Sequence, residues 1–223
     1  MKKTIVYVDG YNLYYFLRQH HPKLKWLDLV GLAENMLAPD HAIVSVNFYT
    51  APVIGDKKAM RQKTYWVALK KHASANRQKL KIYIGEFKRV IKKGKLTANN
   101  AVPLPVLPSS SFEFETLEEK QTDVTLAIQL VRDAFLKRFD VAAVITNDTD
   151  FISAIRMVRQ EAKLPVWLLS PTPKDTGRLG PHKGLRRLVT PDFVKRIEEK
   201  HLKSAQLPKR IPKTNIVRPK GWG

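Results

Sequence analysis

The sequence contains no cysteine among its 223 residues, so disulfide bonds and thiolate metal sites are excluded. It also has no apolar stretch near the roughly 20 residues that a membrane-spanning helix needs. The first apolar run, Thr4–Val8, ends at Asp9 and is too short for the core of a signal peptide. No GxGxxG pattern follows this run, which argues against a dinucleotide-binding fold. These absences favour a cytoplasmic protein with no membrane partner.

Acidic residues are scarce relative to basic ones. The chain has 20 Asp and Glu against 40 Lys and Arg, which gives a formal net charge of +20 and a pI near 10.1. A positive field of this size attracts polyanions, and nucleic acid is the commonest of them. The basic residues predicted to contact nucleic acid lie in three segments: Lys57, Lys58, Arg61 and Lys63; Lys88, Arg89, Lys92, Lys93 and Lys95; and Lys174, Arg178, Lys183, Arg186 and Arg187.

Short apolar runs alternate with segments of helical periodicity along most of the chain. This alternation predicts an α/β fold of three layers, in which helices cover both faces of a mainly parallel sheet. Val90–Ser111, which contains three prolines, is predicted to be a loop or edge excursion. The predicted strands are Thr4–Val8, Ala42–Tyr49, Leu80–Phe87, Val141–Thr146 and Pro165–Leu169, with a strand or turn at Leu185–Val189. The predicted helices are Tyr11–Arg18, Leu27–Leu37, Lys57–Ala73, Glu118–Lys137, Phe151–Ala162 and Pro191–Glu199.

The composition changes near residue 200, so a domain over residues 1–200 and a basic tail over residues 201–223 are predicted. The tail has no acidic residue, and its prolines at 208, 212 and 219 favour an extended, mobile segment. Trp222 is unusual in a purely solvated tail and indicates that this segment docks somewhere.

Four aspartates fall where strands are expected to end or helices to begin. Asp9 follows the first strand, and Asp148 and Asp150 follow the strand Val141–Thr146. Asp123 lies near the start of a strongly periodic helix. Each of Asp9, Asp123 and Asp150 has a structural alternative, as a turn residue, a first-turn acid or a helix cap. Asp148 has no obvious structural role. Sites in parallel sheets form at the carboxyl ends of strands, so these acids are expected to share one edge.

Neighbouring carboxylates repel one another unless a cation lies between them, and Mg²⁺ or Mn²⁺ is the hard ion that oxygen ligands prefer. A metal held by carboxylates lowers the pKa of bound water and neutralises charge on a phosphoryl group, which is what phosphodiester hydrolysis needs. The six histidines form no convincing acid–base pair, which disfavours a metal-independent ribonuclease. The sequence therefore predicts Asp9, Asp123, Asp148 and Asp150 as metal ligands and catalytic residues.

Three segments together resemble the motifs of the NYN domain family, the LabA-like branch of the PIN-like nucleases. Val6–Leu13 is similar to the family's hDGxNh opening (h, apolar), Glu119–Val124 to EKxxDV, and Ile145–Phe151 to hSGDSDF. The resemblance implies a PIN-like domain, with metal bound by the same four aspartates. It also implies supporting roles for Asn12, Glu119, Lys120, Thr146 and Asn147.

The sequence departs from the family pattern at two places. Thr146-Asn147 stands where Ser-Gly is usual, and asparagine is expected to tolerate a positive φ if the backbone needs one there. Gln121-Thr122 replaces the common Gly-Ser or Gly-Val, which is expected to be a minor change. The carboxylates themselves are retained, so catalysis is still expected.

The function expected from these features is a metal-dependent ribonuclease that binds RNA through its basic surface. The alternative is a non-catalytic RNA-binding or regulatory module that keeps the same fold. An oxidative enzyme, a label that some LabA-like proteins carry, is disfavoured because no flavin, haem or nicotinamide site is evident. The sequence leaves a homodimer open.

Overall fold

The central element of the fold is a six-stranded sheet in the order β3-β2-β1-β6-β7-β8, and every neighbouring pair in it is parallel. The computed structural model describes residues 1–94, 112–173, 181–189 and 193–222. The strands of this sheet are β1 (Lys2–Asp9), β2 (His41–Thr50), β3 (Leu80–Ile84), β6 (Val141–Ile145), β7 (Val166–Ser170) and β8 (Val194–Arg196).

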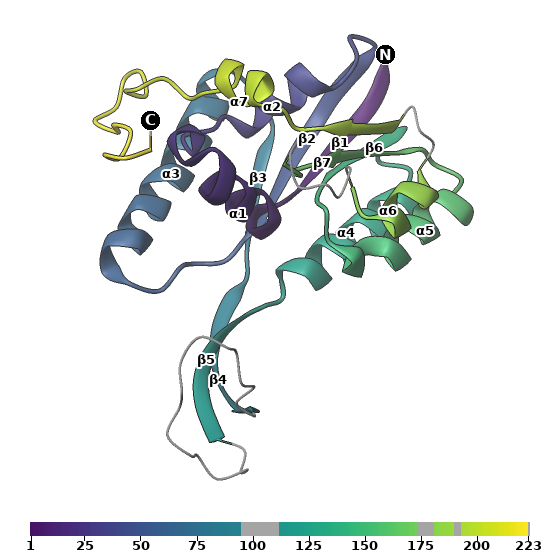
Figure 1. The fold of residues 1–223 in the computed structure, drawn as a ribbon. Helices are drawn as coiled ribbons and strands as arrows, with labels where there is room; N and C mark the ends of the chain where they lie inside the picture. Colours follow the sequence, from purple (N-terminus) through teal and green to yellow (C-terminus); the bar gives the residue numbers. More distant parts are fainter. Residues whose placement is uncertain (95–111, 174–180, 190–192, 223) are drawn as a thin grey trace.

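Helices cover both faces of this sheet (Figure 1). On one face α1 (Gly10–His20), α2 (Leu29–Met36), α3 (Asp56–Ala75) and α7 (Glu199–Ser204) bury one hydrophobic cluster. On the other face α4 (Thr122–Phe135), α5 (Ile152–Gln160) and α6 (Lys183–Leu188) bury a second cluster. Alternate residues of β1 supply both clusters, since Val6 and Val8 point to the first and Ile5 and Tyr7 to the second. The predicted three-layer α/β fold is therefore confirmed.

The order of the strands creates a switch point between β1 and β6. From β1 the chain proceeds to β2 and β3 on one side, and later builds β6, β7 and β8 on the other. Val8 of β1 lies opposite Ile145 of β6, so both strands end at the same edge. The loops after such strands diverge to opposite faces and leave a crevice between them, which is where open α/β sheets bind ligands.

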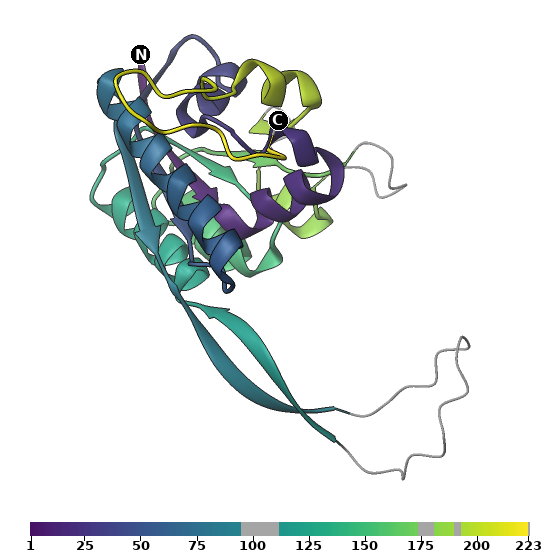
Figure 2. The same ribbon diagram turned by 90° about the vertical axis from the view of Figure 1, so that its left-hand side faces the viewer.

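A long antiparallel hairpin projects from the body of the molecule (Figures 1 and 2). It consists of β4 (Glu86–Gly94) and β5 (Phe112–Lys120), which pair over their full length. The predicted strand Leu80–Phe87 is thus divided at Gly85, and the predicted loop is wrong for Val90–Gly94, while residues 95–111 lie outside the described ranges. The predicted helix Glu118–Lys137 begins only at Thr122, because Phe112–Lys120 has the two-residue alternation of a strand.

The apolar residues of α4 lie on two sides of the helix, and only one side is buried. Val124, Ile128 and Phe135 are exposed, whereas Leu126 and Leu130 are fully buried. The helix carries apolar residues on two sides, so its 3.6-residue period is clear from the sequence but the side that faces the sheet is not.

The C-terminal region differs most from the prediction. Leu185–Val189 is mainly the helix α6, and the predicted helix Pro191–Glu199 contains the strand β8, with α7 beginning at Glu199. Pro191 and the residue after it lie outside the described part of the chain. A three-residue strand at the edge of a sheet carries too short an alternation to be distinguished from a helix.

The segment after α7 does not project into solvent but packs on the domain. Leu207, Ile211 and Trp222 are buried in the same cluster as α1, α2 and α3. Trp26 Nε1 also donates to the Pro208 carbonyl oxygen at 2.9 Å. The prediction of an extended, mobile tail is wrong, and the interpretation of Trp222 as a docking residue is confirmed. In the described ranges, no helix is long and apolar enough to cross a lipid bilayer.

Candidate metal and nucleic-acid site

Asp9 is a buried carboxylate at the junction of β1 and α1. Its side chain is only 5% exposed, and it caps α1 because Oδ1 accepts the backbone N–H of Asn12 at 3.0 Å. Its other oxygen, Oδ2, accepts the hydroxyl of Thr146 at 2.8 Å. Thr146 is fully buried directly after β6, so this bond joins the two strands at the switch point.

The surroundings of Asp9 disfavour its charge. Desolvation, with a smaller contribution from the nearby charge of Asp148, outweighs the lowering effect of the Asn12 and Thr146 hydrogen bonds, and the net result is a pKa raised from 3.8 to about 6. A buried acid with a perturbed pKa at a sheet switch point is a candidate functional group.

This shift predicts how the stability of the metal-free protein depends on pH. The folded-state pKa of Asp9 exceeds its unfolded value, so its contribution to stability is full below about pH 4 and is lost as pH rises through 6. At pH 8 the loss is about 3 kcal/mol. The free energy of unfolding of Asp9→Asn, measured by urea denaturation in EDTA, should therefore rise relative to wild type between pH 4 and pH 8. A difference that does not change with pH would contradict this assignment.

The loop after β6 holds a second carboxylate beside Asp9. The Thr146 hydroxyl that bonds Asp9 also accepts the backbone N–H of Asp148 at 3.0 Å, so one side chain organises both acids. Asp148 Oδ1 accepts the backbone N–H of Asp150 at 3.0 Å and thereby caps the short 3₁₀ helix η2 (Thr149–Phe151). Asp148, which the sequence left without a structural role, is thus the cap, and Asp150 is not. Asp148 Oδ2 accepts no hydrogen bond within the described residues.

Asn12 and Asn147 both hold the loop that follows β6 in place. The Asn147 backbone N–H donates to Asn12 Oδ1 at 3.0 Å. The backbone of Asn147 does not have a positive φ, so this position does not require the conformational freedom of the glycine that is usual in the family. Its Oδ1 instead accepts the His182 backbone N–H at 2.9 Å and lies 3.5 Å from Ser170 Oγ. Asn147 therefore ties the start of α6 and the end of β7 to the site. Sequence reasoning missed His182 and Ser170, because nothing local marks them.

The other predicted site residues are less closely joined. Asp123 is half-buried in the first turn of α4, a helix that packs against η2, and Asp150 is exposed. Lys120 Nζ pairs with Glu118, while for Glu119 only the backbone, in β5, is described. Across the described ranges, no group of three or more His, Asp or Glu lies close enough to hold a metal. The structure therefore brings Asp9 and Asp148 together, and does not gather all four aspartates around one ion.

Gly10 is required by the close approach of α1 to β2. A Cβ atom at this position would lie 2.3 Å from the Tyr49 carbonyl oxygen and 2.7 Å from the Phe48 ring. Gly10→Ala must therefore displace α1 and, with it, Asp9. We expect a loss of about 1–3 kcal/mol in the free energy of unfolding, the usual cost of overpacking. The control is Gly31→Ala in α2, where the nearest atom is Oδ2 of Asp28 at 3.0 Å, which needs to move by only a few tenths of an ångström. The melting temperature of this variant should stay near wild type. Equal melting temperatures for both variants would contradict this role of Gly10.

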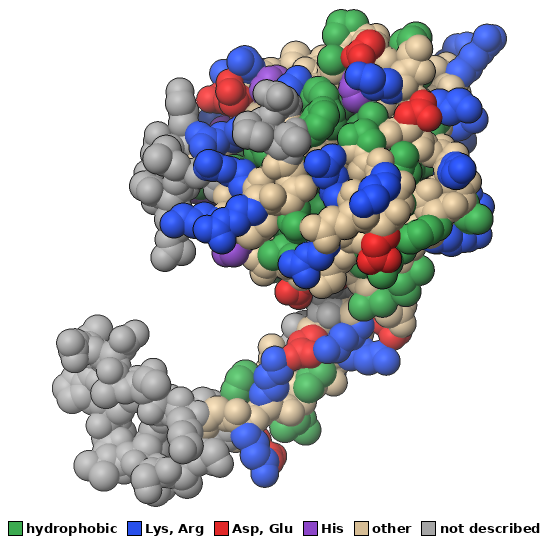
Figure 3. Space-filling model, turned by 90° about the vertical axis from the view of Figure 1, so that its right-hand side faces the viewer, with side chains coloured by type: hydrophobic (Ala, Val, Ile, Leu, Met, Phe, Trp, Pro, Cys, Tyr) green, Lys and Arg blue, Asp and Glu red, His purple; other side chains and the backbone are tan. Residues whose placement is uncertain are grey.

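The predicted RNA-binding cations differ in whether acids neutralise them. On the hairpin, Lys88 pairs with Glu86, Arg89 with Glu115, Lys92 with Glu118 and Lys93 with Glu113. Basic and acidic side chains accordingly lie next to one another along the hairpin in Figure 3. Within the described residues, no ion pair involves Lys57, Lys58, Arg61 or Lys63 of α3, nor Lys183, Arg186 or Arg187 of α6. Lys95, Lys174 and Arg178 lie outside these ranges.

The sequence of this chain matches the model of a known protein family. The family model described as NYN domain matches residues 3–179, which include β1, β6 and the aspartates at their ends. The chain therefore belongs to the NYN domain family, whose members have a nuclease-like PIN fold and are generally nucleases.

Two individual proteins are similar to this chain. The 6-hydroxy-3-succinoylpyridine 3-monooxygenase HspA of Pseudomonas putida is 27% identical, over 99% of this chain and 75% of that protein. A crystal structure of a protein of unknown function from Vibrio parahaemolyticus is 13% identical, with a TM-score of 0.47, over 89% of this chain and 94% of that one. The second likeness is too low to bear on function.

Proposed function

We propose that this protein is a metal-dependent ribonuclease of the LabA-like branch of the NYN family, with its reaction centre at Asp9 and Asp148. The observation that carries the proposal is the buried carboxylate of Asp9 beside Asp148, at the switch point between β1 and β6. Two acids held this way in a chain of net charge +20 need a positive partner at the site itself.

The donor set fits a small divalent ion. Mg²⁺ keeps several of its waters and is commonly bound by one or two carboxylates together with the phosphates of a substrate. Asp9 and Asp148 would supply those carboxylates, and the free Oδ2 of Asp148 is an available donor atom. Asp123, in the first turn of α4, and Asp150 would act on water molecules or on the substrate from further away. Mn²⁺ has the same preference for oxygen ligands.

When bound there, the ion supplies a Lewis acid and a more acidic water for attack on phosphorus. The protein's own residues hold the site in shape for this chemistry. Thr146 positions both acids through one hydroxyl, and Asn12 fixes Asp9 through its backbone and the Asn147 loop through its side chain. The carboxylates repel RNA on their own, so the unpaired cations of α3 and α6 must supply attraction for the phosphate backbone.

The experiment is incubation of 5′-labelled single-stranded RNA with the full chain in Mn²⁺, in Mg²⁺ and in EDTA, followed by end-group analysis. We expect cleavage with either ion, none in EDTA, and products with 5′-phosphate and 3′-hydroxyl ends. RNA that is bound but stays intact with both ions would favour the non-catalytic RNA-binding module. Cleavage in EDTA would exclude the metal mechanism.

A second candidate function rests on one observation. The similarity to the monooxygenase HspA extends over 99% of this chain rather than over one motif, and the name of that protein describes a reaction on a pyridine. A monooxygenase consumes O₂ and two electrons from a reductant, so oxygen uptake with hydroxylated pyridine carboxylates and NADH distinguishes the two candidates. We expect no uptake by this protein.

A further inference from the structure

A pocket of about 250 Å³ is lined by residues of α1 and α3. It begins at Gly10, the residue after Asp9, and extends along α1 to Arg18, a distance of about 12 Å at the helical rise of 1.5 Å per residue. Its volume is just below the range of about 300–1,000 Å³ that drug-sized ligands occupy. The pocket is therefore of a size for one small ring system with a substituent.

Aromatic side chains make the walls of this pocket. Tyr14, Tyr65, Trp66 and Trp222 all line it. Trp66 is half-buried, and its Nε1–H is shielded from solvent without an acceptor in the described part of the chain. The pocket therefore offers a ligand the faces and edges of aromatic rings, on which a flat ring can stack.

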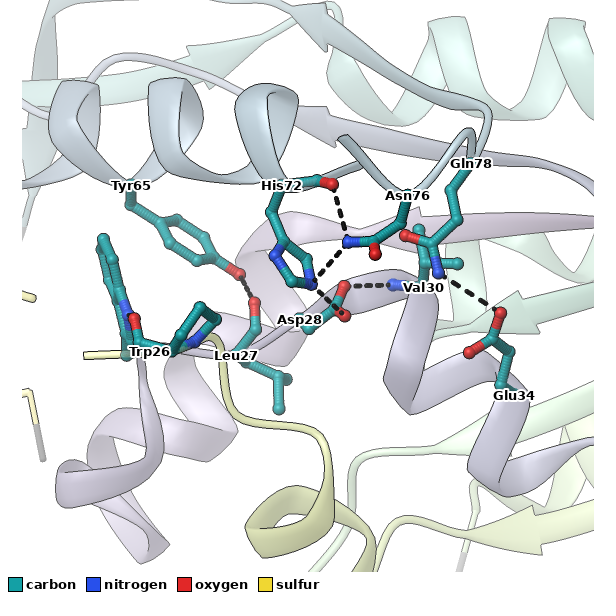
Figure 4. A network of polar contacts seen from close by, with 10 residues as sticks. Trp26, Leu27, Asp28, Val30, Glu34, Tyr65, His72, Asn76 and Gln78 are labelled. Carbon is teal, nitrogen blue, oxygen red and sulfur yellow. Dashed lines mark hydrogen bonds and ion pairs between the residues drawn. The ribbon is translucent and has the colours of Figure 1, made fainter. Parts of the chain in front are cut away.

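The walls are held in place before any ligand binds. Tyr65 points from α3 toward the segment before α2, where its hydroxyl donates to the Leu27 carbonyl oxygen at 2.7 Å (Figure 4). His72 on the same helix approaches Asp28 at 3.4 Å. The Trp222 ring packs on Tyr65 with centroids 5.6 Å apart and on Trp26 at 6.3 Å. Preorganised walls of this kind lower the entropy lost on binding.

Positive charge gathers at the same pocket without a matching acid. The pocket is lined by four cations, Arg18, Lys25, Lys58 and Arg61, and by no acidic residue. In the ranges that the structure describes, none of these cations is in an ion pair. Lys25 lies over the Trp222 ring, with Nζ 5.5 Å from its centroid. Burial, and then the charges of Arg61 and Arg18, lower the pKa of Lys25, as is expected where like charges lie close together. An anion would relieve this repulsion.

We propose that this pocket binds one nucleotide of the RNA, with the base against the aromatic walls and a phosphate at the cluster of Arg18, Lys25, Lys58 and Arg61. A flat heteroaromatic ring with a negative charge is the ligand chemistry that both features select, because bases stack on aromatic side chains and cations bind phosphate. The proposal rests on the proposed ribonuclease function, since RNA is the source of the nucleotide. The pocket starts one residue after Asp9, so a strand seated here continues toward the carboxylates.

The test is a binding experiment in EDTA, where cleavage does not contribute. Uridine monophosphate, uridine, ribose 5-phosphate and pyridine-3-carboxylate are titrated into the full chain, and the indole N–H resonances of its four tryptophans are followed by NMR. We expect the monophosphate to bind more tightly than uridine or ribose 5-phosphate, and to shift the resonances of Trp66 and Trp222. Trp167, which packs between His41 and Phe193 away from the pocket, serves as the internal reference.

Arg61→Ala and Lys70→Ala form a matched pair, because both cations are exposed on α3 but only Arg61 lines the pocket. Arg61→Ala should weaken the monophosphate about tenfold or more, and Lys70→Ala less than about twofold. Equal effects of the two substitutions would overturn the proposal, as would binding of pyridine-3-carboxylate without binding of the nucleotide. If the nucleotide binds but RNA is not cleaved, the pocket stands and the nuclease function fails. If RNA is cleaved and no nucleotide binds, the pocket assignment alone fails.

Discussion

Asp148→Asn is expected to reduce RNA cleavage by about 100-fold or more while the protein remains folded. The carboxylate lies beside the buried Asp9, and its Oδ2 is the donor atom that the substitution replaces with an amide. Removing a ligand of a catalytic metal costs several kcal/mol of transition-state stabilisation, and each 1.4 kcal/mol is tenfold in rate. The side-chain oxygen of asparagine can still cap η2, so the melting temperature should change little. The rate is measured under single-turnover conditions with saturating Mn²⁺.

Asp40→Asn is the matched control for this substitution. Asp40 lies just before β2, at the opposite edge of the sheet, and its exposed carboxylate pairs with Lys2 at 2.8 Å. Cleavage by this variant should equal that of wild type. Full activity of Asp148→Asn would mean that the chemistry takes place elsewhere, and equal losses in the two variants would point to a general effect of charge.

Removal of residues 207–223 is expected to destabilise the fold by several kcal/mol and to lower the melting temperature by about 10 °C or more. The truncation removes the buried side chains of Leu207, Ile211 and Trp222, and burial of a Leu or Ile stabilises by about 1.5–3 kcal/mol. It also exposes Trp26 and deprives its indole N–H of the Pro208 carbonyl oxygen. Because whole domains are stable by only about 5–15 kcal/mol, the truncated chain could lose its fold altogether.

The same segment carries charge, and a second variant separates the two roles. Lys209→Ala with Lys213→Ala removes two exposed cations and leaves the buried side chains in place. Its melting temperature should remain within about 2 °C of wild type. If these lysines bind phosphate, the slope of RNA affinity against salt concentration, both on logarithmic scales, should flatten by about 0.7 for each phosphate that the variant no longer neutralises. A truncated protein that melts at the wild-type temperature would show that the segment is not part of the domain.

The parts of the fold that could be predicted are those with strong local patterns. The runs that became β1 and β6 are apolar on both faces and stop abruptly at polar residues, which is typical of central strands in a parallel sheet. Ligand sites in open parallel sheets form at the carboxyl ends of the strands, and Asp9 and Asp148 lie at the carboxyl ends of β1 and β6. Asp123 lies in the first turn of α4, near a helix start as predicted, whereas Asp150 lies inside η2 and is not a cap. The distance of each from Asp9 and Asp148 depends on loop geometry.

The remaining features depend on contacts between residues far apart in the sequence. The helical period of α4 does not reveal that Leu126 and Leu130 form its buried side, because apolar residues on both sides of a helix fit the same period. Trp222 docks on Tyr65 and Trp26 in a segment whose local composition resembles a solvated tail. The pocket beside α1 arises from the same docking, so no single stretch of sequence encodes it.

Binding of Mn²⁺ to the metal-free protein tests the central claim most directly. Electron paramagnetic resonance counts free Mn²⁺ during a titration of wild type and of the double variant Asp9→Asn, Asp148→Asn, each with and without a phosphorothioate oligonucleotide. We predict a saturable Mn²⁺ site in wild type that the double variant lacks. The oligonucleotide should strengthen Mn²⁺ binding at this site. Binding should weaken as pH falls through about 6, where Asp9 takes up a proton. Saturable binding of equal strength in both proteins, or none in wild type with the oligonucleotide present, would contradict a metal-dependent nuclease centre at Asp9 and Asp148.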